Sequence, residues 1–413
     1  MQMPISTAQS PRLLNAAVVV AALGYFVDIY DLLLFGIVRV PSLQSLGLTG
    51  ENLTRQGEFL LNTQMVGMLI GGMLWGVLGD KKGRLSVLFG SIFLYSVANI
   101  ANGFVQGIPG YAFWRFIAGI GLAGELGAGI TLVSEVLPKE KRGIGTMIVA
   151  SVGLTGAVVA NLIYRFSGDW RMCYFIGGGL GLALLLLRVG VSESGMFRHA
   201  KQEGVSRGNF FALFTNRQRL FKYLCCILIG LPTWYVIGIL VTFSPEFAKV
   251  LNIQGEVRGG DAIMYAYIGI VLGDLATGAL SQLLKSRLKV MYTFLALSAV
   301  VIAVYLNLDG ASAGTLYFIC GLLGFATGFW VIFVTIAAEQ FGTNLRATVT
   351  TTVPNFVRGA LPLLVILFNF FLEPLGRIGA ATAVGVFVIA TSMLAVRGLK
   401  ETFHQDLNYT EEA

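Results

Sequence analysis

The chain has 413 residues, of which 55% are hydrophobic and only 12% are charged, with 52 glycines and a net charge of +7. Soluble globular domains carry about 25% charged residues, so most of this surface is expected to face lipid rather than water. The positive charges lie in short segments between apolar runs. They therefore indicate membrane topology and argue against a nucleic-acid partner.

Apolar runs long enough to cross a bilayer, about 20 residues each, recur twelve times along the chain. In chain order they cover residues 13–37, 58–79, 85–106, 110–136, 144–165, 171–190, 222–245, 261–284, 289–307, 313–338, 347–371 and 378–396. This pattern predicts an all-α membrane protein with twelve transmembrane helices. The longest polar stretch divides it into a first half over 1–190, a linker over 191–221, a second half over 222–400 and a tail over 401–413.

The loops predict the orientation in the membrane. Loops on the side of both termini hold 20 lysines and arginines, and the opposite loops hold seven. Because cytoplasmic loops carry the excess of positive charge, both termini and the linker are expected in the cytoplasm. The first apolar run does not have the pattern of a cleaved signal peptide. We expect a multi-pass protein of a plasma membrane, namely a bacterial inner membrane.

Corresponding loops of the two halves repeat at a fixed distance. Glu135 and Arg142 flank one turn, and Glu339 and Arg346 flank the corresponding turn 204 residues later. Parallel repeats of this kind place a solute site between two halves that rock against each other. We interpret these four residues as structural and gating contacts between helix ends rather than as solute ligands.

Three segments resemble the major facilitator superfamily. They are GDKKGR (residues 79–84), RFIAGIGLAGELGAGITLVSEVLPKEKRG (residues 115–143) and DIYD (residues 28–31). The second is similar to the metabolite:proton symporter branch, which includes proline/betaine, α-ketoglutarate, citrate and shikimate permeases. The resemblance implies two pseudo-symmetric six-helix bundles and a gating role for Asp80 and Arg84. One departure is that Ser281 and Gln282 stand where a second signature loop would have its aspartate.

Ionisable side chains inside the spans are candidates for function, because each is costly in hydrocarbon unless it is paired or faces water. Six occur, namely Asp28, Asp31, Arg115, Glu125, Asp274 and Arg358. At 1.5 Å per helical residue, Asp28 and Arg115 come to similar depth, so we predict that they pair, with Asp31 beside them. These three residues and Glu125 are our candidates for proton coupling. The alternatives are a static salt bridge and, for Glu125, a carboxylate that is hydrogen-bonded within its own half.

Arg358 and Asp274 come to similar depth near the middle of the membrane, without charged counterparts in the first half. A guanidinium matches a carboxylate, so we predict that Arg358 binds a solute carboxylate and that Asp274 holds it between cycles. The alternative is a permanent ion pair. Prolines 232, 354 and 362 predict interrupted helices. Other candidate solute ligands are Gln64, Trp234, Tyr235, Trp330 and Asn355.

The leading hypothesis is proton-coupled symport of a small organic acid, amino acid or betaine by a monomer in the lipid bilayer. The second is a facilitator or exchanger that does not use protons, and the least favoured is a membrane sensor. The sequence argues against an enzyme, because its two histidines lie in polar loops and no catalytic-triad spacing occurs. It argues against an ATP-driven pump, because it has no P-loop. The four cysteines lie in apolar runs without CxxC spacing, so no metal or cofactor is expected.

Overall fold

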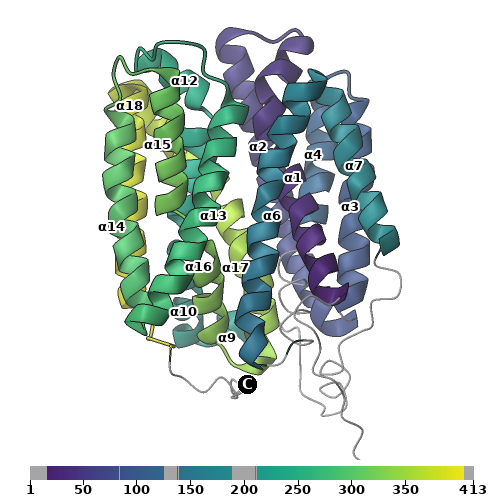
Figure 1. Ribbon diagram of the computed structural model, residues 1–413, viewed down its shortest axis with the longest axis vertical. Coiled ribbons are helices and arrows are strands. Elements are labelled where there is room, and N and C mark those ends of the chain that lie inside the picture. The colour runs from purple at the N-terminus through teal and green to yellow at the C-terminus, as the bar shows by residue number, and fades with distance from the viewer. Residues whose placement is uncertain are drawn as a thin grey trace, which may run out of the picture.

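The computed structural model describes residues 16–82, 84–124, 137, 139–187, 210 and 212–403. Within these ranges every regular element is a helix, apart from one isolated bridge between Gln254 and Ser312. Long helices stand side by side in one upright bundle (Figure 1). We call the end that holds the turn after Ser45 the upper face and the opposite end the lower face, as they are oriented in Figure 1.

The first half is built from six described helices: α1 (Ala16–Ser45), α2 (Gly50–Lys82), α3 (Arg84–Gly103), α4 (Ile108–Leu122), α6 (Lys139–Ser167) and α7 (Trp170–Leu187). Its most extensive contacts join α1 with α6, α2 with α4 and α3 with α7. Gly67 and Gly71 of α2 lie directly against the backbone of α4 at Phe116 and Ile120, where a Cβ atom would collide. Small residues allow this close approach of membrane helices.

The second half contains shorter helical pieces: α9 (Ala212–Thr215), α10 (Arg217–Leu228), α11 (Leu231–Tyr235), the π-helix η1 (Val236–Val241), α12 (Ser244–Val250), α13 (Gly259–Leu284), α14 (Arg287–Leu306), α15 (Ala313–Ala326), α16 (Trp330–Glu339), α17 (Thr343–Gly359) and α18 (Leu361–Arg397). Its largest contacts join α13 with α15 and α14 with α18. Successive pieces such as α15 and α16 continue one another through the bundle (Figure 1).

Nine segments of the described chain are long and apolar enough to cross a membrane. The last one, Thr343–Arg397, has 55 residues and turns at Gly376, whose φ of 66° and ψ of 176° are not helical. It therefore supplies two of the predicted spans, and α3 and α4 occupy the positions of two more. The twelve predicted spans fit these helices, although α1 continues to Ser45 rather than ending near residue 37.

Two of the three predicted proline interruptions are present. The helix restarts at α11 with Pro232 in its first turn, and α18 starts with Pro362 in its first turn. Pro354 lies inside α17 without interrupting it, so that prediction was wrong. A further interruption, at Thr327–Phe329 between α15 and α16, was not predicted. Both η1 and this gap lie close to the candidate site, where irregular backbone is common in transporters.

Three sets of polar contacts join the two halves near the upper face. Arg39 of α1 forms a buried ion pair with Glu246 of α12 at 2.7 Å. Asp261 of α13 accepts hydrogen bonds from Asn161 and Arg165 of α6, at 2.9 and 3.1 Å. The third contact, at 3.0 Å, joins Asn369 of α18 to Glu58 of α2. Ion pairs and hydrogen bonds therefore connect the two halves at the upper face in this structure.

The predicted contact between Glu339 and Arg346 at the lower face is not formed. The carboxylate of Glu339 lies 3.4 Å from Arg287 and accepts a hydrogen bond of 2.6 Å from Thr402. Arg346 donates to the backbone carbonyls of Ala338 and Phe341 instead. The repeat argument located the correct loop but missed the competing partners from α14 and the C-terminal segment.

Glu401 fastens that C-terminal segment to the start of α14. It accepts a hydrogen bond from Ser286 and further bonds from the backbone amides of Arg287 at 2.9 Å and Leu288 at 3.2 Å. Burial raises the pKa of Glu401, but these hydrogen bonds outweigh it, so the net pKa lies below its ordinary 4.5. An anion at a helix N-terminus is favourable because it binds unpaired amides and the positive end of the dipole.

We expect Glu401→Gln to lower the melting temperature at pH 7 by about 1–3 °C, as the loss of a helix cap does. A lowered folded pKa means that the carboxylate stabilises the fold above its unfolded pKa and loses this effect as the pH falls through the folded pKa. The difference between variant and wild type should therefore shrink as the pH falls below the ordinary pKa of glutamate, and vanish below the lowered pKa of Glu401. Thermal unfolding in detergent at several pH values tests this, with the exposed Glu373→Gln as control. A constant difference at all pH values would contradict it.

Candidate transport site

The predicted span charges that the structure describes lie in the interior of the bundle. Exposed fractions are 0% for Asp28 and Arg115, 2% for Arg358 and 6% for Asp274. None of these four side chains faces the lipid side, as the cost of a charge in hydrocarbon requires. The buried charges form two groups, one around Asp31 and one around Arg358, and residues of helix α1 contribute to both groups.

The first group surrounds Asp31 within the first half. Its carboxylate is 1% exposed. Among the side chains, Arg115 on α4 exerts the largest electrostatic effect on this carboxylate. Asn99 of α3 lies beside the carboxylate without good hydrogen-bond geometry. Gly177 of α7 lies directly against it, so that a Cβ atom there would collide with Oδ1. Asp31 is thus enclosed by three helices besides its own.

The predicted pair between Asp28 and Arg115 is not formed. Arg115 donates instead to the side-chain oxygen of Gln64 on α2, and its charge acts on Asp31. Asp28 acts electrostatically on Tyr25 and Tyr267, and the positive charge of Arg358 acts on the same two side chains. Both aspartates are on α1 and act on each other, but Asp28 also shares an electrostatic neighbour, Tyr267 of the second half, with Arg358.

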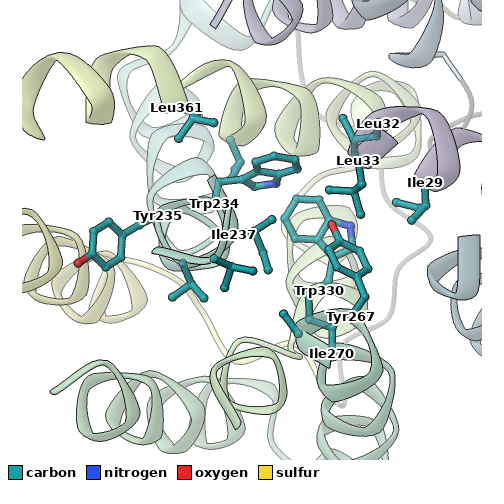
Figure 2. Close-up of a cluster of buried hydrophobic side chains, with 14 of the residues drawn as sticks. Ile29, Leu32, Leu33, Trp234, Tyr235, Ile237, Tyr267, Ile270, Trp330 and Leu361 are labelled. Atoms are coloured by element: carbon teal, nitrogen blue, oxygen red, sulfur yellow. The ribbon is translucent and has the colours of Figure 1, made fainter. Parts of the chain in front are cut away.

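The second group surrounds Arg358 on α17. Its guanidinium lies 5.7 Å from the ring of Trp330 and 6.0 Å from the ring of Trp234, within the range of cation–π attraction. Its Nη1 donates to Asn355 at 3.4 Å. Figure 2 shows both indoles in one cluster with Tyr267 and with residues of α1, namely Ile29, Leu32 and Leu33. Two halves of the bundle therefore meet around Arg358.

Asp274 does not hold Arg358 in this structure, contrary to the prediction. Its Oδ1 accepts the backbone N–H of Val331 at 3.0 Å, in the first turn of α16. The interruption before α16 leaves this amide without a helical partner, and a carboxylate satisfies both the amide and the helix dipole. No ion pair joins Asp274 to Arg358 in the described part of the chain. Asp274 is better explained as a helix cap beside the site.

The remaining predicted solute ligands separate into different places. Asn355 bridges the halves, because its Nδ2 donates to Ala123 of the first half at 2.8 Å. Gln64 belongs with Arg115, not with Arg358. Tyr235 points away from the cluster (Figure 2) and donates to the carbonyl of Ala381 at 2.6 Å, so it packs within the second half. Trp234 and Trp330 remain beside Arg358.

Comparison with known protein families decides the identity of this fold. The family model of the Major Facilitator Superfamily matches residues 21–365. The chain belongs to the Major Facilitator Superfamily. This confirms the family predicted from the signature segments.

Relatives and solved structures agree with that membership in the superfamily. A putative metabolite transport protein of Haemophilus influenzae is 28% identical, over 83% of this chain and 85% of the relative. A 3-(3-hydroxy-phenyl)propionate transporter of Escherichia coli is 26% identical, over 71% of this chain and 72% of the relative. A proline/betaine transporter of Salmonella typhimurium is also 26% identical, over 81% of this chain and 73% of the relative.

The crystal structure of a D-xylose-proton symporter matches 94% of this chain and 98% of its own, with a TM-score of 0.69 and 16% identity. The predicted all-α fold of this superfamily is thereby confirmed, and the described helices fit the twelve predicted spans. As a member of the superfamily, the chain is a multi-pass membrane transporter of small metabolites.

Several residues predicted from the superfamily resemblance fall outside the described part of the molecule. Glu125 and Glu135 are not among the described residues. Asp80, Arg84 and Arg142 lie on described helical backbone, but their side chains are not described. Their coupling and gating roles remain predictions.

Sequence reasoning missed four residues of this superfamily member's site. Tyr25 lies three residues before Asp28 and Tyr267 lies seven before Asp274, spacings that place each tyrosine on the same helix face as the acid. That spacing was a usable signal. Asn99 and Gly177 meet Asp31 only through tertiary packing, for which the sequence offers no local pattern.

We expect Gly177→Ala to impair transport severely, because the new methyl group would collide with Asp31 and with Tyr30 at 2.7 Å. Gly179→Ala, two residues along the same helix, meets nothing within 4 Å and should transport like the wild type. Initial uptake rates, normalised to protein in the membrane, test the pair. Equal rates for the two variants would show that Asp31 tolerates displacement.

Proposed function

We propose that this chain is a proton-coupled symporter of a small organic acid, amino acid or betaine-like metabolite that works by alternating access. Residues 1–190 and 222–400 form the two moving halves, 191–221 the cytoplasmic linker and 401–413 the cytoplasmic tail. The lower face is then the cytoplasmic side of a bacterial inner membrane and the upper face is the external side. The protein acts as a monomer.

One observation carries this proposal, namely the division of buried charge along α1. The charge of Arg115 acts on Asp31 within the first half, whereas Asp28 and Arg358 act together on Tyr25 and Tyr267. A nearby arginine favours an ionised carboxylate and burial favours the neutral acid. A small movement of α1 relative to α4 therefore shifts the balance between these two effects and binds or releases a proton at a carboxylate oxygen of Asp31.

The solute enters this scheme at Arg358, next to the other aspartate on the same helix. Binding of an anion beside Arg358 changes the field at Asp28 and draws α1 toward the second half. The named solutes of two relatives, an aromatic propionate and the zwitterions proline and betaine, support a carboxylate-bearing solute. The contacts at the upper face, among them Arg39 with Glu246, support an inward-open or occluded stage of the cycle.

Uptake by proteoliposomes with an imposed pH gradient tests the function. With an alkaline interior, we expect labelled 3-(3-hydroxyphenyl)propionate, benzoate, proline or glycine betaine to accumulate above equilibrium, and a protonophore to abolish the accumulation. Uptake that only equilibrates, whatever the gradient, would favour the facilitator or exchanger. Absence of uptake and exchange for a broad panel of acids and amino acids would favour the membrane sensor.

A further inference from the structure

The charge around Arg358 favours an anionic solute. The guanidinium is permanently ionised, is 2% exposed, and has no carboxylate at ion-pair distance among the described residues. Its Nε has no hydrogen-bond acceptor in that part of the chain. A buried cation with unfilled donor positions is unfavourable until an anion compensates it.

A second donor next to Arg358 is also unfilled. The indole N–H of Trp330 is buried and has no acceptor within the described ranges. Trp330 is the aromatic ring closest to the guanidinium, at 5.7 Å. One carboxylate has two oxygens and accepts from both donors at once. The polar end of the solute is thereby defined as a carboxylate held by an arginine and an indole N–H.

The same geometry disfavours a quaternary ammonium group. Such groups bind to the faces of tryptophan and tyrosine rings, but here both indole rings already lie against a guanidinium, at 5.7 and 6.0 Å. A second cation would meet a fixed positive charge of the same sign. Asp274 is occupied at Oδ1 by the Val331 amide.

The body of the solute would meet flat aromatic and branched aliphatic surfaces. Trp234, Tyr267 and Trp330 supply rings from three segments of the second half, and Ile29, Leu32 and Leu33 come from α1 (Figure 2). Aromatic side chains gain additional affinity from offset or edge contacts with another ring. A saturated ring of equal size fills the same volume but does not gain the additional affinity of contacts between aromatic rings.

We infer that the solute is a planar aromatic carboxylate, bound through Arg358 and the Trp330 N–H, with its ring among Trp234, Trp330 and Tyr267. This inference rests on the proposed function, because it specifies the solute class of that same site. It excludes aliphatic zwitterions as the main solutes of this protein, which the proposed function leaves open.

Calorimetric titration of the purified protein in detergent tests this without any pH gradient. The ligands are matched pairs: benzoate with cyclohexanecarboxylate, nicotinate with nipecotate, and benzoate with uncharged benzamide, together with proline and glycine betaine. We expect at least one aromatic acid to bind about tenfold or more tightly than its saturated counterpart, and benzamide, proline and betaine to bind weakly or not at all. Preference for a saturated acid, for proline or for betaine would overturn the inference, and so would a folded protein that binds none of the aromatic acids.

Two conservative variants assign the contact. Trp330→Phe keeps a ring but removes the N–H, so aromatic acids should bind about tenfold or more weakly. Trp114→Phe makes the same change on α4, where Trp114 packs edge-on against Phe113 at 5.0 Å, and should bind like the wild type. Unchanged binding in Trp330→Phe would contradict the assignment.

The two proposals fail in different ways. If aromatic acids bind selectively but their uptake does not depend on the pH gradient, the aromatic carboxylate is supported as the solute and proton coupling is contradicted. If uptake is proton-driven for proline or betaine alone, coupling stands and the inference fails.

Discussion

Replacing Arg358 with glutamine is expected to abolish solute uptake while leaving the protein folded and in the membrane. Glutamine retains donors and much of the length but removes the charge that compensates a carboxylate in the interior. Charge-assisted hydrogen bonds are worth about 1.5–3 kcal/mol each, so the loss of a bidentate contact lowers affinity by about a hundredfold or more. Arg358→Lys should fail as well, because an ammonium does not reproduce the planar fork.

Arg377 offers a matched control for this experiment. Its guanidinium lies 5.7 Å from Phe247 and 5.9 Å from Phe368, so Arg377→Gln removes the same charge from a similar aromatic setting on α18. We expect Arg377→Gln to retain most of the uptake. Initial rates, membrane content by immunoblot and melting temperature should be measured for all three variants. Wild-type uptake by Arg358→Gln would remove Arg358 from the site.

Replacing Asp31 with asparagine is expected to abolish accumulation driven by protons while preserving exchange of solute across the membrane. Asparagine has nearly the same shape but binds no proton, so the cycle loses its coupling and keeps its solute site at Arg358. Accumulation should fall to the equilibrium level, because no proton then moves with the solute through this carboxylate. Counterflow of labelled against unlabelled solute measures the remaining exchange.

Asp28 provides the informative comparison, because it lies three residues away on the same helix. We expect Asp28→Asn to change the apparent affinity for solute, since Asp28 and Arg358 act on the same tyrosines, and to leave the dependence on pH in place. Loss of coupling in Asp28→Asn together with normal coupling in Asp31→Asn would reverse the roles assigned to the two aspartates.

The sequence predicts the charges that surround the candidate site but not how they pair, and it does not predict the buried pair of Arg39 with Glu246. Hydropathy and depth predict a pair between Asp28 and Arg115, yet Arg115 donates to Gln64 and its charge acts on Asp31. Residues three apart on a helix differ by about 4.5 Å in height and about 60° in direction, which is enough to point them into different halves. Depth estimates fix only height, so the rotation of α1 had to come from packing.

The partner of Asp274 could not be predicted, because the sequence does not predict the helix interruption between α15 and α16. Gly328 lies between α15 and α16, but glycine is common inside continuous membrane helices, so it was not interpreted as a helix end. The gap frees the amide of Val331, and Asp274 binds that amide instead of Arg358. Trp234 and Trp330 lie beside Arg358, and their role as solute ligands stays a prediction.

The most direct test measures proton and solute movement together in the same proteoliposomes. A pH-sensitive dye inside the vesicles reports protons while a labelled aromatic acid is added at equal pH on both sides. We expect the vesicle interior to acidify as the acid anion enters, in a fixed ratio of protons to solute, and Asp31→Asn to exchange solute without this acidification. Solute entry with no proton movement in the wild type, or identical proton movement in Asp31→Asn, would contradict it.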